Sequence, residues 1–280
     1  MFNQLKTVAL LGLLTGLMLG VGGMIGGRGG LTVALVFAGL MNFGMYFFSD
    51  RIALAMYGAQ EAKKSQYHKL HKMVEELAHK AGIPKPKVYV IPIDTPNAFA
   101  TGRSPSHASV AATEGIMSLL SDDELRGVLA HEISHVKNRD TLVVTIAATM
   151  AGVISYLAHM AQFAAFFGGG RDDGGRNPIG LLVLAIITPI MAMLIQMAIS
   201  RSREYLADES GAHLIKDGKP LASALKKLEM GVRHHPMRVG SPATSSLFIV
   251  NPFSGNAIMS LLSTHPPLHK RVERLHQLKF

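Results

Sequence analysis

The sequence predicts a mainly α-helical, multi-pass membrane protein with four transmembrane helices and an α+β domain outside the membrane. Three observations lead to this fold class. Hydrophobic residues make up 48% of the chain and charged residues only 17%, whereas soluble domains carry about 25% charged residues. The uncharged positions gather in four long runs, and the charged ones gather after the second and the fourth run. An ordinary soluble globule and a disordered chain are therefore excluded.

The four uncharged runs define the predicted organisation. Each is long enough to cross the hydrocarbon core as a helix, which takes about 17–25 residues. We expect a two-helix transmembrane hairpin at 1–48, a polar segment at 49–140, a second transmembrane hairpin at 141–200 and a second polar segment at 201–280. The first run could instead be a secretory signal. It lacks an Ala-x-Ala cleavage pattern and a second run follows at once, which favours an uncleaved anchor.

The basic residues predict the orientation in the membrane. Of the 28 Lys and Arg residues, 12 lie in residues 49–140 and 12 in residues 200–280. Because Lys and Arg concentrate on the cytoplasmic side of bacterial membrane proteins, we expect both polar segments at the cytoplasmic face of a bacterial inner membrane. The net charge of +9 then fits a protein that faces anionic lipid. Aromatic residues are not interleaved with the basic ones, so no nucleic-acid partner is expected.

Both polar segments contain regular elements, with strands only in the first. We expect a helix at 60–81, strands near 87–92 and 108–112, and helices at 199–216, 220–233 and after residue 267. Ser121 and Glu124 have the spacing of a capping box, which predicts the start of a further helix. The stretch 231–251 is rich in Gly, Pro and Ser and is expected to be a mobile loop or lid.

The helix after Ser121 carries a metal-binding pattern, His131-Glu132-Ile133-Ser134-His135. Histidines at i and i+4 project from one helix face, so both imidazoles can reach one metal ion. Glu132 follows the first histidine and can act as general base toward a water that zinc activates. The chain has no cysteine, so its metal ligands must be His, Asp or Glu. We expect one zinc ion per chain, with His131 and His135 as ligands and Glu132 as the catalytic residue.

The best candidate for the third ligand is Glu204, on the helix that follows the fourth uncharged run. A catalytic zinc ion takes three protein ligands and keeps one position open. Asp208 lies one turn further along the same helix face and can accept the free ring N–H of a ligand histidine, which we expect to be His131. Alternatively, Glu204 pairs only with a neighbouring arginine. The Glu ligand and the H-E-x-x-H helix together predict a zincin-like (gluzincin) catalytic domain.

Other polar positions are weaker candidates. His159 lies in the third uncharged run, where a hydrogen bond to another helix explains it as well as a functional role. His265 and His269 flank two prolines and could stabilise an oxyanion or act as a reserve ligand. The segment 95–102 could present an edge strand to which an extended peptide adds, or it could be only a structural hairpin.

These motifs resemble those of the M48 family of membrane zinc peptidases over essentially the whole chain. The shared features are Asn97-Ala-Phe-Ala100, His131–His135 followed by Asn138-Arg-Asp140, Ser202–Asp208, Thr264–Pro267 and the order of the spans. The resemblance implies a zinc endopeptidase with a cytoplasm-facing active site. It further implies proteolytic quality control under stress, with unfolded or misfolded membrane proteins as substrates and the lipid bilayer as a partner.

Three other functions compete with this interpretation. A metal-stabilised membrane chaperone or scaffold would need a closed site with four ligands. An intramembrane-cleaving metalloprotease would carry its motif within a span, but charged residues flank His131–His135 on both sides. A metal transporter would need more polar residues within the spans than the sequence has. A membrane-surface zinc peptidase agrees best with all of these features.

Overall fold

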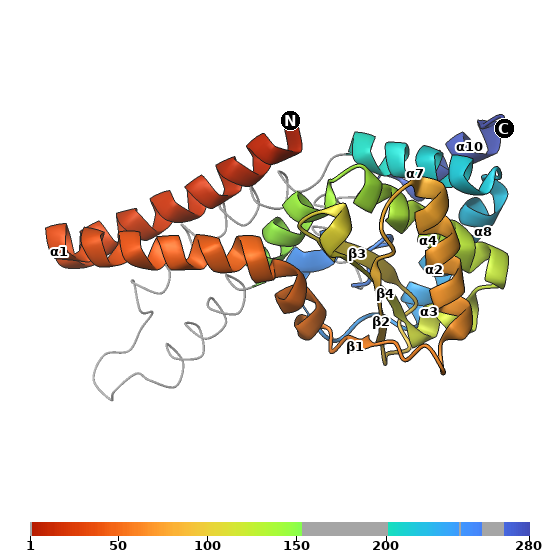
Figure 1. Cartoon of the computed structure of the whole chain (residues 1–280), viewed down its shortest axis with the longest axis horizontal. Coiled ribbons are helices and arrows are strands. Elements are labelled where there is room, and N and C mark those ends of the chain that lie inside the picture. Colours follow the sequence, from red (N-terminus) through yellow and green to blue (C-terminus); the bar gives the residue numbers. More distant parts are fainter. Residues whose placement is uncertain (1, 153–200, 241, 254–265) are drawn as a thin grey trace, which may run out of the picture.

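The computed structural model describes residues 2–152, 201–240, 242–253 and 266–280. The protein is mostly helical with one small mixed sheet. Figure 1 shows a body built around this sheet and a long helical arm, α1 (Phe2–Met56), that extends away from it. The segment boundaries predicted at 48, 140 and 200 stay predictions. Most of the segment 141–200 lies outside the described residues.

Helix α1 is folded back on itself as a hairpin, as Figure 1 shows. The Asn42 side chain donates a hydrogen bond of 2.8 Å to Thr15 Oγ1. On a straight helix these two residues would lie about 40 Å apart, at 1.5 Å per residue. The turn lies at Gly27, whose φ of +53° is in the left-handed region, where glycine meets no Cβ clash. The main chains of Gly22 and Gly30 approach so closely beside the turn that a Cβ on Gly30 would lie 2.0 Å from Gly22 O.

The hairpin has an apolar outer surface. Within the described residues, Gly27–Met56 is the one stretch long and apolar enough to cross a membrane, and Leu5–Gly20 and Thr141–Gly152 are shorter apolar helices. The remainder of the third predicted span and the whole of the fourth lie outside the described residues. The N-terminal segment is a helical hairpin, and one of its arms is long and apolar enough to cross a membrane. The two-span hairpin at 1–48 and the four-span topology stay predictions.

The sheet has the strand order β1-β2-β4-β3. Its strands are β1 (Gln60–Glu61), β2 (Lys87–Ile91), β3 (Ala98–Gly102) and β4 (Ala108–Thr113). Strand β4 pairs parallel with β2 and antiparallel with β3, which places Ala112 opposite both Val90 and Ala98. All residues of β3 and β4 are buried, so β3 is an edge strand by pairing and is nevertheless covered.

Helices cover the sheet and position the site. They are α2 (His68–Ala81), α3 (Glu114–Leu119), α4 (Asp122–Lys137), α7 (Arg201–Ile215), α8 (Lys219–His234) and α10 (Leu268–Gln277). Helix α4 contacts β3 and β4 and also α2, α7 and α8, so it lies at the centre of the body. Its Val128, Leu129 and Ile133 are fully buried in the main apolar cluster.

The predicted helix at 60–81 is wrong in its first third. Gln60 and Glu61 form β1, which pairs antiparallel with Val90 and Tyr89, and α2 begins only at His68. The reason is tertiary, because the main-chain groups of β1 find partners on a strand that lies almost thirty residues further along the chain. The predicted strands and the other helices agree with the structure within a few residues.

Candidate metal centre

Helix α4 holds the histidine pair in a buried position. Its first turn is closed by the predicted capping box, in which Ser121 accepts from Glu124 N and the Glu124 side chain accepts from Ser121 N. His131 is fully buried, and the His135 side chain is 15% exposed. The ring nitrogens Nε2 of the two histidines lie 3.1 Å apart. The i, i+4 spacing therefore brings both imidazoles to one point, as predicted.

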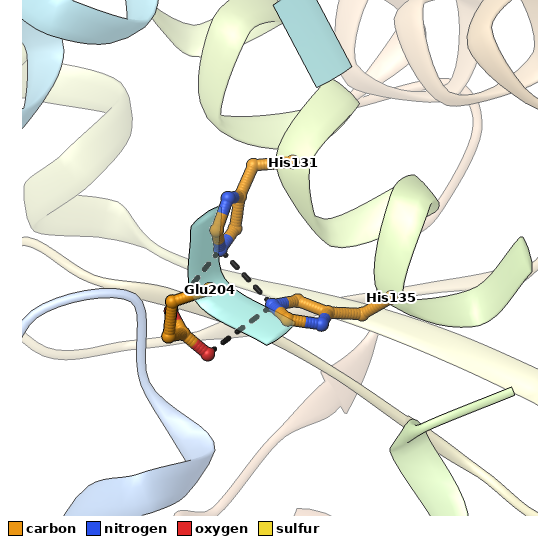
Figure 2. A group of neighbouring side chains, drawn as sticks. All are labelled: His131, His135 and Glu204. Carbon is orange, nitrogen blue, oxygen red and sulfur yellow. Dashed lines mark hydrogen bonds and ion pairs between the residues drawn. The ribbon is translucent and has the colours of Figure 1, made fainter. Parts of the chain in front are cut away.

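Helix α7 brings Glu204 to the same point. Its Oε1 lies 3.6 Å from His135 Nε2 and its Oε2 lies 3.7 Å from His131 Nε2. Figure 2 shows the three side chains converging, two from α4 and one from α7. One ligand atom from each residue lies within 4.8 Å of the other two. Helices that are separated by more than sixty residues thus form one three-donor cluster.

The donor set fits a tetrahedral metal ion. Donors that each lie about 2.0–2.2 Å from one ion are about 3.3–3.6 Å apart in tetrahedral geometry. The two Nε2 atoms lie 3.1 Å apart, and each lies 3.6–3.7 Å from a different oxygen of the Glu204 carboxylate, which is comparable with this range. Two imidazole nitrogens and one carboxylate oxygen suit zinc among the common divalent ions. His131, His135 and Glu204 could therefore hold a metal ion with little rearrangement.

A buried carboxylate lies behind each histidine. Asp208 Oδ1 is 2.9 Å from His131 Nδ1, which is the contact that the sequence predicted, and Asp140 Oδ2 is 3.1 Å from His135 Nδ1. A carboxylate that faces Nδ1 favours a proton there and leaves Nε2 free as a ligand. Both Nε2 atoms then point their lone pairs at each other, an arrangement that a cation between them stabilises.

Sequence reasoning did not assign a role to Asp140. This residue follows a turn in which Arg139 adopts a φ of +58°, and the turn carries Asp140 back toward the last histidine of α4. The signal available in the sequence was the position of an acidic residue just beyond the helix end.

Arg271 on α10 is the second residue that sequence reasoning missed. Its side chain is 2% exposed, and its Nε and Nη2 donate hydrogen bonds of 2.8 and 2.7 Å to the two oxygens of Asp208. Its Nη1 donates to Ile249 O at 3.0 Å and lies 3.9 Å from Glu204 Oε2. A sequence signal did exist, because Arg271 occupies the i+3 position of the apolar stripe formed by Leu268, Val272 and Leu275.

The surroundings of the site shift the pKa values of its ionisable groups in different directions. Burial raises the pKa of Glu132 to about 8, and nearby Glu204 adds to this effect. Burial lowers the pKa of His131. Burial also opposes the charged form of His135, but the carboxylates of Asp140, Glu204 and Glu132 raise its pKa to about 10. Burial would raise the pKa of Asp208, and the Arg271 guanidinium instead holds it well below its usual range.

Glu132 faces the same cavity as the three candidate ligands. The cavity is also lined by Ala100 of β3 and by Ser246, Leu247, Phe248 and Ile249. The Glu132 carboxylate accepts a hydrogen bond from the main chain of Ala100, so it is oriented by the edge strand. A carboxylate with a raised pKa beside a three-donor cluster is suited to take up and release a proton near neutral pH.

The remaining candidate histidines do not join this cluster within the described residues. His269 is exposed at the start of α10, and it does not line the cavity. His159 and His265 lie outside the described residues.

Three comparisons relate the chain to known proteins. Residues 64–279 match Peptidase family M48. A Protease HtpX homolog of Syntrophotalea carbinolica is 55% identical over 278 residues, which cover 99% of both chains. A Protease HtpX homolog of Pyrococcus furiosus is 53% identical over 276 residues, which cover 98% of this chain and 95% of that protein. The crystal structure of S. mikatae Ste24p has a similar fold, with a TM-score of 0.52 and 21% identity, over 98% of this chain and 65% of that one.

Proposed function

The chain belongs to peptidase family M48 and is a metallopeptidase, and from this premise we propose that it is a zinc-dependent endopeptidase whose ligands are His131, His135 and Glu204. One observation carries the proposal. Three zinc-type donors from α4 and α7 converge, and Glu132 lines the same cavity as these donors. A closed structural site would instead offer a fourth protein ligand. The described residues contribute three.

Each residue of the site has its own role in the proposed hydrolysis of a peptide bond. When bound, zinc acts as a Lewis acid and lowers the pKa of a water toward about 7. Glu132 takes the proton from the attacking water and passes it to the leaving amine, and its raised pKa of about 8 suits both transfers. Asp208 and Asp140 contact the Nδ1 atoms of the two imidazoles and would leave both Nε2 atoms free to hold the ion. Arg271 holds the Asp208 carboxylate in its charged form.

The substrate proposal follows from the position of β3. This strand lies at the edge of the sheet, and Ala100 within it lines the cavity. We propose that an extended polypeptide segment pairs with β3 and so passes in front of Glu132. Main-chain pairing selects for unfolded backbone rather than for one side chain. Unfolded or misfolded membrane proteins are the substrates that this mode of binding and the apolar arm together favour.

The membrane arrangement is also a proposal. The outer surface of α1 exposes large apolar side chains, among them Val33, Phe37 and Leu40, which suits contact with lipid. The first turn of α4 carries three acidic residues, so we place the site beside the membrane surface rather than within the hydrocarbon. We propose that it faces the cytoplasm of a bacterial cell. Cysteine introduced at Gly29 should react with an impermeant thiol reagent from the opposite side to cysteine introduced at Glu209.

The test of the function compares the wild-type protein with Glu132→Gln. Both proteins are purified in detergent, their zinc content is determined, and casein cleavage is measured. Cleavage by the wild type alone, with about one zinc ion in each protein, supports the endopeptidase and the role of Glu132. Zinc in both proteins with cleavage by both contradicts that role. A folded wild type without zinc contradicts the metal centre.

A further inference from the structure

Residues 246–250, here termed the covering segment, close the cavity over the candidate metal centre. Four of its residues line this cavity together with the three candidate ligands. The remaining space is about 20 Å³, which is room for about one water molecule. An extended peptide does not fit into this space. In the described part of the chain, the covering segment therefore stands between Glu132 and an extended substrate that would bind along β3.

The covering segment occupies the free hydrogen-bonding edge of β3. The Ile249 N–H donates to Ala98 O at 3.3 Å, and the Asn97 side chain donates to Val250 O at 2.7 Å. The opposite edge of β3 is filled by β4. The protein's own main chain thus takes one position on the free edge of this strand, Ala98 O, at which an extended peptide would otherwise pair.

The covering segment is also tied to the surroundings of the metal centre. Arg271 Nη1 donates to Ile249 O at 3.0 Å, while the other nitrogens of the same guanidinium bind Asp208. Asp208 in turn contacts His131. One buried side chain therefore connects the segment that blocks access with a carboxylate that orients a candidate ligand.

One aromatic side chain anchors the covering segment. Phe248 is 1% exposed, and its ring packs edge-on against Tyr57 at 4.9 Å and Phe99 at 5.3 Å between centroids. The main-chain pairing between the covering segment and β3 is much less extensive than the pairing between β4 and β3. Strand β3 pairs with β4 at five register positions. The covering segment begins within the 3₁₀ helix Pro242–Leu247 and makes one main-chain bond to β3. A peptide that forms a regular ladder could displace it.

We propose that the covering segment is autoinhibitory, because it occupies the substrate site along β3 and must leave this edge before an extended polypeptide can bind. The inference rests on the proposed function for the identity of the competing ligand. It adds that the resting enzyme is closed by its own chain, so that only segments able to compete for β3 gain access. Such a device restricts cleavage to polypeptide that is already unfolded.

A disulfide between the covering segment and β3 tests this inference. The chain has no cysteine, so Ala98→Cys with Ile249→Cys introduces one defined pair. Residues joined by a main-chain bond between neighbouring strands have Cα atoms about 5 Å apart, within the range that a disulfide spans. Both side chains also belong to the same apolar cluster. The two single-cysteine variants are the matched controls.

The primary readout is the rate at which 1,10-phenanthroline removes zinc from the loaded protein. We expect the oxidised pair to lose zinc at least tenfold more slowly than the reduced pair. In the two single-cysteine variants, the rate of zinc removal should be the same under oxidising and reducing conditions. Casein cleavage should be lost on oxidation and restored by dithiothreitol. Equal rates of zinc removal in the oxidised and reduced pair, with the disulfide verified by thiol counting, overturn the proposal. Zinc removal that responds to oxidation in a protein that never cleaves casein contradicts the proposed function alone.

Phe248→Leu gives a second test that needs no disulfide. Loss of the two ring contacts should loosen the covering segment and raise the rate of zinc removal several-fold. The control is Phe253→Leu, the same change in the same loop at a residue that does not line the cavity. Equal rates in Phe248→Leu, Phe253→Leu and the wild type contradict an anchored cover.

Discussion

Gly211 of α7 lies directly against the main chain of His131 in α4. A Cβ placed on Gly211 would be 2.8 Å from His131 N and 3.0 Å from His131 Cα. Helix α7 also carries Glu204 and Asp208, so this close approach sets the distance between the two halves of the metal centre. The missing side chain of one glycine allows the donors of two helices to meet.

Gly211→Ala should therefore weaken metal binding. The added methyl group must push α7 away from α4, which separates Glu204 from the two histidines. We expect a loss of about 1–3 kcal/mol in stability, as for other overpacked cores, together with weaker zinc affinity measured by competition with a chelating dye. Glu209→Ala on the exposed side of the same helix is the control. Unchanged affinity in Gly211→Ala would show that the helix spacing does not limit the site.

Asp140→Asn tests the carboxylate that sequence reasoning did not assign. Asparagine keeps the size of the side chain but removes the charge that faces His135 Nδ1 at 3.1 Å. Loss of a carboxylate behind a ligand histidine typically weakens metal affinity about 10–100-fold, and we expect an effect of this size in zinc titrations. Asp123→Asn, an exposed change in the first turn of α4, should leave the affinity unchanged. Wild-type affinity in Asp140→Asn would remove Asp140 from the centre.

Arg271→Gln should destabilise the whole body. It leaves the buried carboxylate of Asp208 without its two hydrogen bonds from the guanidinium, and breaking a buried ion pair typically costs about 3–5 kcal/mol. Thermal unfolding in detergent should show a clear decrease in Tm. Arg271→Lys should recover only part of it, because an ammonium group cannot bind both oxygens in parallel. Glu273→Gln, exposed on the same helix, should behave like the wild type.

The stability of the body should fall in acid through Glu124. Burial would raise the pKa of this carboxyl, but hydrogen bonds from Lys227 Nζ, Ser121 N and Ser223 Oγ lower it to about 2. A folded-state pKa below the usual 4.5 means that the ionised form stabilises the protein above about pH 4.5. This contribution of about 1–3 kcal/mol is lost as the pH falls toward 2.

The comparison of wild type with Glu124→Gln measures that contribution. Unfolding free energies should differ above about pH 5 and converge as the pH approaches 2, because glutamine cannot ionise. Asp123→Asn in the same turn of α4 should keep the pH dependence of the wild type between pH 5 and 2. A constant difference between wild type and Glu124→Gln over the whole range would assign the effect to packing instead of charge.

The sequence by itself determined those features whose cause is local. His131, Glu132 and His135 could be placed because helical periodicity brings i and i+4 to one face. The start of α4 could be placed because the capping box closes within one turn. A helical hairpin within residues 1–48 could be predicted because two long uncharged runs follow each other there. Glu204 and Asp208 could be selected because they share one helix face and because the chain has no cysteine.

Only the tertiary structure decided the features that depend on contacts between distant segments. Strand β1 was mistaken for helix because its partner, β2, lies further along the chain. The positions of Arg271 and Asp140 in the sequence are unusual, but their partners are fixed only when α10 and the turn after α4 pack against the site. The covering segment has the composition of an exposed loop, yet Phe248 and Ile249 are buried on β3. Local periodicity determines which side chains share a helix face, and long-range packing determines which of those faces meet.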